Sequence, residues 1–146
     1  MLMIDLDPVI WGPHYWFFLH TLSMTYPKHP NDVVKKKYYD FIQNLPLFIP
    51  HSKMSKSFSD MLDIYPVSPY LDSKDSFIRW IHFIHNKVNK KIELPQISMS
   101  KFYTDYYENY KTRDVKYIEY AKTKRHILYG ILIVLLFGTI YFLYNK

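Results

Sequence analysis

The side chains best suited to chemistry lie in three short segments of this 146-residue chain. Residues 11–27 read WGPHYWFFLHTLSMTYP, residues 48–58 read FIPHSKMSKSF, and residues 80–92 read WIHFIHNKVNKKI. In the last segment histidine and asparagine recur three and four residues apart, which places them on one face of a helix beside aromatic rings. Such a face offers hydrogen-bond donors and stacking surfaces to a ligand, although the aromatic core of a helical bundle would use the same residue types.

His51 and Met54 place an imidazole and a thioether within one helical turn. Both groups are acceptable copper ligands, but two ligands make a weak site, so we predict no metal centre here. The chain contains no cysteine. Disulfide bonds, thiolate metal sites and thiol nucleophiles are therefore excluded within it.

Apolar residues repeat at helical spacing between proline-containing turns, and strand signals are few. The repeat is clearest in the fourth predicted helix, where it comprises Phe77, Trp80, Ile81, Ile84, His85 and Val88. We expect helices at residues 12–26, 31–45, 51–64, 73–89 and 98–110. This pattern predicts an all-α fold, a four-helix bundle with a short fifth helix.

An uncharged run of 18 residues, ILYGILIVLLFGTIYFLY, occupies positions 127–144. As a helix it is about 27 Å long, close to the hydrocarbon thickness of a bilayer, and it predicts a single membrane span. Three cations at residues 122–125 precede the run and only Lys146 follows it, which predicts a cytoplasmic N-terminal domain. The chain start lacks a signal-peptide pattern, so we expect a tail anchor. The predicted organisation is a bundle domain at 1–112, a basic juxtamembrane linker at 113–126 and a transmembrane helix at 127–144.

The formal net charge is +6, from 19 Lys and Arg against 13 Asp and Glu. Much of the excess lies in three groups, at residues 35–37, 87–91 and 122–125. No arginine-rich stripe or nucleic-acid motif accompanies them. We interpret the first two groups as solvated helix faces and predict no nucleic-acid partner.

The three segments in this order resemble the Erv/ALR family of FAD-dependent sulfhydryl oxidases, including the compact versions of large DNA viruses. The resemblance covers residues 10–110 and consists of WG-x-x-x-W-x-x-LH, then F-I before a proline, then W-x-x-x-x-HN-x-VN. It implies an Erv/ALR-like bundle that holds FAD between its helices, with a lysine at the end of the fourth helix near the phosphates. The residues it assigns to the cofactor are Gly12, Trp16, His20, Tyr26, His85, Asn86, Val88, Asn89 and Lys91.

The family's CxxC redox pair aligns with His51 and Met54. Neither an imidazole nor a thioether can cycle between dithiol and disulfide, as sulfhydryl oxidation requires. Ser52 and Ser55 offer an alternative register, but hydroxyl groups cannot perform this chemistry either. The resemblance therefore implies no catalytic residue at these positions, and the chain also lacks the shuttle cysteines that would relay electrons.

Three functions stay open at this point. The first is a redox-inactive, membrane-anchored binding or structural module that retains FAD, from a large DNA virus and placed in the virion membrane. The second is an active flavin-dependent oxidoreductase, and the third is a cofactor-free virion membrane scaffold. Family members pair through their first two helices, which implies a homodimer here as well. The viral assignment rests on the likeness and on a composition rich in Lys, Asn, Ile and Tyr.

Overall fold

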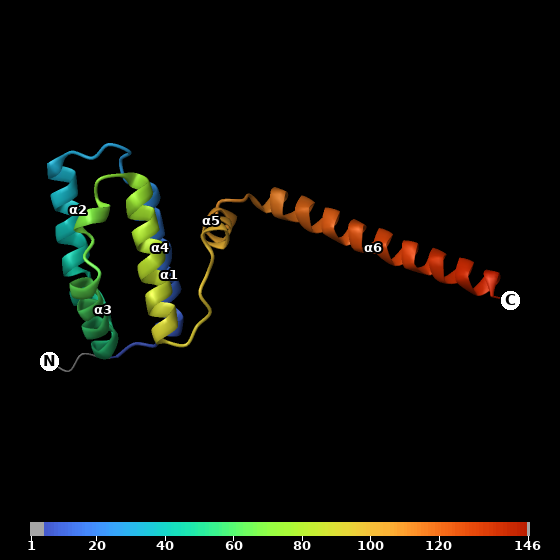
Figure 1. Cartoon of the computed structure of the whole chain (residues 1–146), viewed down its shortest axis with the longest axis horizontal. Coiled ribbons are helices and arrows are strands. Elements are labelled where there is room, and N and C mark those ends of the chain that lie inside the picture. The colour runs from blue at the N-terminus through green and yellow to red at the C-terminus, as the bar shows by residue number, and fades with distance from the viewer. Residues whose placement is uncertain (1–4, 146) are drawn as a thin grey trace. The chain divides into compact units, whose positions relative to one another are not determined.

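The structure is a computed structural model that describes residues 5–145. Its helices are α1 (Pro8–Met24), α2 (Asp32–Asn44), α3 (Ser52–Ile64), α4 (Lys74–Lys91), α5 (Met99–Glu108) and α6 (Arg113–Tyr144), with 3₁₀ turns η1 (Leu45–Phe48) and η2 (Ser68–Tyr70). Residues 5–145 contain no strand. The predicted all-α class is confirmed (Figure 1). The chain divides after Tyr106 into two compact units, which are described separately.

Helix α1 begins at Pro8, four residues before the predicted start at Gly12. The Asp7 carboxylate caps it by accepting a hydrogen bond of 2.9 Å from the Val9 N–H, and proline suits the first helical position because it has no N–H to satisfy. The predicted start, which was placed between Pro8 and Pro13, was wrong because Pro8 itself occupies the first helical position. Pro13 instead lies inside the helix, at the cost of one backbone hydrogen bond.

The core forms where the inner face of α4 packs against the other helices of the bundle. Figure 1 shows α1 and α4 side by side, with α2 and α3 next to them. On α4, Phe77, Trp80, Ile81 and Ile84 are at most 1% exposed, as the helical repeat predicts. Trp80 also donates a hydrogen bond of 3.2 Å from Nε1 to the Tyr65 carbonyl. Burial and this bond fix α4 against the end of α3.

The chain leaves α4 through a tight turn that is fastened by asparagine side chains. Glu93 adopts a φ of 59°, and the Leu94 N–H donates to the Asn89 carbonyl at 2.8 Å, as in a Schellman motif. Farther along, the Asn86 side chain accepts from the Ile97 N–H at 2.8 Å and donates to the Ile97 carbonyl at 2.9 Å. The segment after α4 is therefore tied back onto the helix.

Helix α6 is 32 residues long, and its most apolar 18-residue window has a mean hydropathy of 2.3. By length and composition it is the one described helix that qualifies as a candidate membrane span. Thr112 caps its start by accepting from the Val115 N–H at 3.4 Å. Residues 113–126, predicted as a linker, are helical and continuous with residues 127–144.

Candidate functional site

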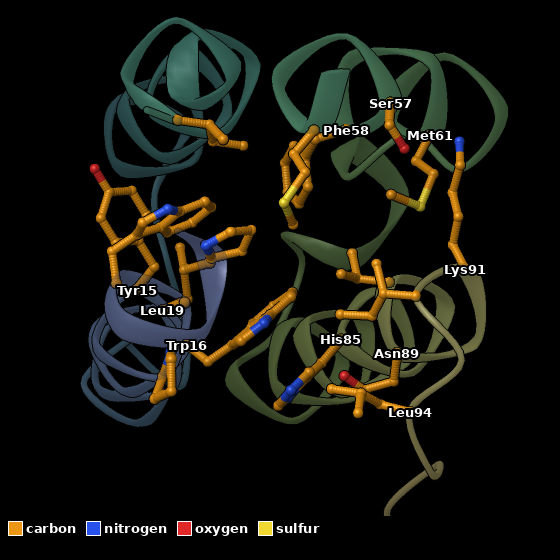
Figure 2. Close-up of a pocket in the computed structure, with 18 of the residues that line it drawn as sticks. Tyr15, Trp16, Leu19, Ser57, Phe58, Met61, His85, Asn89, Lys91 and Leu94 are labelled. Atoms are coloured by element: carbon orange, nitrogen blue, oxygen red, sulfur yellow. The ribbon is translucent and has the colours of Figure 1, made fainter. Parts of the chain in front are cut away.

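A cavity of about 640 Å³ opens between α1, α3 and α4. Figure 2 shows side chains of α1 and α4, including Trp16 and His85, across the space from Phe58 and Met61 of α3. Most of the lining is aromatic or aliphatic. It comprises Pro8, Val9, Trp11, Gly12, Pro13, Tyr15, Trp16, Leu19, Leu45, Ile49, Lys53, Met54, Ser57, Phe58, Met61, His85, Val88, Asn89, Lys91, Ile92 and Leu94.

The cavity combines apolar walls with two cations. Lys53 on α3 and Lys91 at the end of α4 both line it and are both exposed to solvent. Gly12 lines it on α1, and a Cβ at this position would meet no atom within 4 Å. The chain therefore leaves open space beside Gly12. The arrangement suits a ligand with a flat apolar part and an anionic part.

Trp16, His20 and His85 form a cluster that joins α1 to α4. The Trp16 and His85 rings stack with centroids 4.0 Å apart and an interplanar angle of 12°. Behind them, His20 Nε2 lies 3.1 Å from His85 Nδ1, so that one ring donates its proton to the other. Phe102 of α5 covers His20, with ring centroids 4.5 Å apart. Each imidazole is thereby held in a fixed orientation.

Burial keeps both histidines of this cluster neutral. It lowers the pKa of His85 to about 3, with smaller contributions from His20 and His82. It also lowers the pKa of His20 to about 4, with a smaller contribution from His82. At neutral pH neither ring is an imidazolium, so the pair contributes hydrogen bonds and stacking surface rather than positive charge.

The structure brings six of the nine predicted cofactor residues to the cavity: Gly12, Trp16, His85, Val88, Asn89 and Lys91. The other three lie outside its lining. His20 is one layer behind His85, and Asn86 is engaged with Ile97. Tyr26 is 2% exposed in the core and donates a hydrogen bond of 2.8 Å to the Leu71 carbonyl. A buried hydroxyl group needs a hydrogen-bond partner within the protein, and the Leu71 carbonyl supplies it.

The two residues at the family's cysteine positions sit at the start of α3. His51 is the N-cap, and its Nδ1 accepts from the Met54 N–H at 3.4 Å. Met54 lines the cavity and packs against the core. A residue before α1 also stabilises the start of α3: the Asp5 carboxylate accepts a hydrogen bond of 2.7 Å from the Ser52 N–H. His51 therefore has a structural role as a helix cap, and Met54 has one in apolar packing.

Sequence reasoning missed the α3 wall of the cavity and the second cation. Met54, Phe58 and Met61 recur at intervals of four and three residues, which is a helical-face signal that was available. Lys53 carries no such signal, because its position beside the cavity depends on how α3 packs. Ile92 and Leu94 reach the lining only through the turn at Glu93.

Comparison with known proteins identifies the family. The Erv1/Alr family profile matches residues 13–108, about two thirds of the chain. This chain belongs to the Erv1/Alr family. It is 30% identical over 103 residues to a putative FAD-linked sulfhydryl oxidase of invertebrate iridescent virus 6. The match covers 67% of this chain and 93% of that protein.

Two further similarities support the assignment. A probable FAD-linked sulfhydryl oxidase of Acanthamoeba polyphaga mimivirus is 32% identical over 85 residues, which is 58% of this chain and 59% of that protein, so the match spans little more than half of the relative. The crystal structure of the FAD-binding domain of Erv1 from Saccharomyces cerevisiae superposes with a TM-score of 0.60 at 28% identity, over 64% of this chain and 88% of that one. The Erv/ALR fold predicted from the motifs is confirmed.

The neutral histidine pair predicts a stability that falls in acid. An unfolded histidine binds a proton near pH 6.5, whereas His20 and His85 bind one only near pH 4 and pH 3, so the unfolded state gains protons first as the pH drops. We expect the free energy of unfolding to decrease below pH 6.5 by about 2 kcal/mol per pH unit down to pH 4. Urea titration of the full chain in mild detergent measures this by tryptophan fluorescence, because all three tryptophans lie in the bundle.

A variant pair isolates the contribution of the cluster from that of other titrating groups. His20→Gln/His85→Gln should lose most of the pH dependence, since glutamine does not titrate. His29→Gln, at an exposed position, should keep it. An equal slope in all three proteins would show that the buried pair is not the source.

Proposed function

We propose that this chain is a redox-inactive sulfhydryl-oxidase homologue that retains an FAD-type pocket and acts as a membrane-anchored binding or structural module of a virion. The observation that carries the proposal is one cavity with two properties. Its walls hold the family's motif residues Trp16, His85 and Asn89, while Met54 occupies the cysteine position. The pocket is kept and the thiol is absent.

The residues present fit FAD. Aromatic and aliphatic walls suit its flat rings, and Lys53 and Lys91 suit its diphosphate as charge-assisted donors. Gly12 leaves open space on the α1 side. The proteins named above as FAD-linked oxidases and as an FAD-binding domain support the same cofactor. When bound, the flavin would supply a two-electron acceptor, while His20 and His85 would hold its surroundings neutral and ordered.

Loss of thiol oxidation follows from the absence of a sulfur that can be oxidised reversibly by electron transfer. A dithiol must give up two electrons and two protons to become a disulfide, and the chain has no cysteine to do so. The Met54 thioether and the His51 imidazole have no such couple. The pocket is therefore assigned to binding rather than to sulfhydryl oxidation.

Membrane anchoring is supported by α6 and by its flanking charges. The apolar part of the helix has the length of a bilayer core. Lys122, Lys124 and Arg125 precede it and Lys146 follows it, which favours a cytoplasmic bundle and a single-pass anchor. The viral organisms of two relatives support a viral origin, and the virion membrane is the destination that we propose.

Flavin retention is tested by blocking the cavity at Gly12. The full chain, expressed with ample riboflavin and purified in mild detergent, should show a flavin absorbance spectrum. Gly12→Ala adds a methyl group that meets nothing within 4 Å, so it should keep the flavin. Gly12→Phe projects a ring into the open space and should lower flavin occupancy at least about tenfold, while the protein keeps a helical circular-dichroism spectrum. A colourless wild-type protein that still folds would leave the cofactor-free scaffold as the function.

Thiol oxidation is tested by restoring the cysteine pair. Wild-type protein should not oxidise dithiothreitol above the buffer rate, whereas His51→Cys/Met54→Cys should gain at least about tenfold, because residue 54 lines the pocket. The matched control is Lys36→Cys/Tyr39→Cys, a pair at exposed positions of α2 with the same spacing. Turnover by the wild type would contradict redox inactivity. A yellow His51→Cys/Met54→Cys variant with no gain would contradict the alignment.

A second copy of the chain is the proposed partner of the α1 and α2 surface. A hollow of about 350 Å³ lies there, lined by His14, Tyr15, Phe18, Phe41, Leu45 and Phe48. Phe18 and Phe48 are 52% and 63% exposed, and neighbouring Leu47 is 74% exposed. Apolar side chains gathered on one face favour burial in an interface.

The dimer is tested by placing a charge in this hollow. Phe18→Glu should shift the mass measured by light scattering in detergent from dimer to monomer, since the pairing would bury its carboxylate. Val33→Glu, at a 64% exposed position on α2 outside the hollow, should leave the mass unchanged. A wild-type protein that is monomeric at all concentrations would remove the proposal.

A further inference from the structure

The turn of α6 that precedes its apolar run carries three cations and no acid. Lys122, Lys124 and Arg125 are exposed, and no ion pair found among residues 5–145 includes them. Lys111, by contrast, pairs with Glu108 at 2.8 Å and with Glu119 at 2.7 Å. Positions 120–146 contain no Asp or Glu at all. The positive charge at this turn is therefore unbalanced by the chain.

Helical geometry spreads these cations around the axis. At about 100° per residue, Lys122 and Arg125 lie about 60° apart, and Lys124 lies nearly opposite Lys122. The three residues therefore form a collar around the helix rather than a stripe along one face. A stripe would suit one protein surface, whereas a collar suits an environment that surrounds the helix.

The collar also lies at a defined depth. Because α6 is continuous from Arg113 to Tyr144, Arg125 and Lys122 precede Ile127 by about 3 Å and 8 Å along the axis. The headgroup layer of each leaflet is about 5–8 Å thick. If the apolar run occupies the hydrocarbon core, all three cations fall within that layer, and Tyr129 one turn later falls at its inner edge.

We propose that Lys122, Lys124 and Arg125 bind anionic lipid headgroups in the leaflet through which α6 enters. The inference rests on the proposed membrane anchor. Each lysine or arginine near an anionic surface strengthens binding by about fivefold at moderate ionic strength, and the effect weakens as salt rises. Phosphatidylserine is the natural probe, because its headgroup carries a net negative charge. The headgroup of phosphatidylcholine has the same phosphate but is neutral overall.

The test is native mass spectrometry of the full chain released from detergent micelles that contain equal amounts of dioleoyl phosphatidylserine and dioleoyl phosphatidylcholine. Retained phosphatidylserine should exceed phosphatidylcholine at least about fivefold. Lys122→Gln/Lys124→Gln/Arg125→Gln should bring the ratio near one. Lys28→Gln/Lys37→Gln/Arg79→Gln removes the same charge from exposed bundle positions and should leave the ratio unchanged.

The outcomes separate the collar from the anchor. Equal retention of both lipids would be compatible with the membrane anchor but would contradict lipid binding by the collar. An equal loss of preference in both triple variants overturns it too, because net charge rather than position would be the cause. A protein that stays soluble without detergent and retains neither lipid overturns the anchor and the collar together.

Discussion

The structure depends on two neutral histidines between the first and fourth helices, of which His20 is buried and His85 is half-buried. A charged imidazole in this position would lose its hydration, so the low pKa of His20 and His85 is set by burial itself. Once neutral, the rings satisfy each other with one hydrogen bond of 3.1 Å, and Trp16 closes the stack over His85. Sliding either helix would break the bond and the stack together, so the cluster fixes the α1–α4 register and one wall of the cavity.

The walls of the cavity do not depend on a cysteine pair, which this chain lacks. The walls come from three helices whose packing involves aromatic and aliphatic groups, and none of these contacts requires a thiol. At the two cysteine positions, His51 accepts the capping hydrogen bond of α3 and Met54 fills apolar space. His51 and Met54 thus supply capping and packing at the start of α3 without a thiol, so the fold at these positions does not depend on a cysteine pair.

The sequence predicted the helices well because their apolar repeats and proline boundaries are local signals. It predicted the lining of the cavity less well where long-range packing determines which side chains reach it. Asn86 shares a helix face with His82, and the turn at Glu93 brings the Ile97 backbone back to hydrogen-bond its side chain, a contact that helical spacing alone does not predict. Tyr26 follows α1 closely in sequence, yet the η2 segment supplies Leu71 as its partner. Lys53 was missed because its place at the cavity depends on the packing of α3.

A pocket with such walls has a thermodynamic consequence that is independent of catalysis. A ligand that covers its aliphatic and aromatic walls only in the folded state removes apolar surface from water and stabilises that state. A cofactor present at a hundred times its dissociation constant contributes about 2.7 kcal/mol, a large share of the roughly 5–15 kcal/mol that holds a domain folded. A bound flavin would thus complete the packing between α1, α3 and α4. It would remain part of the core whether or not it accepts electrons from a thiol.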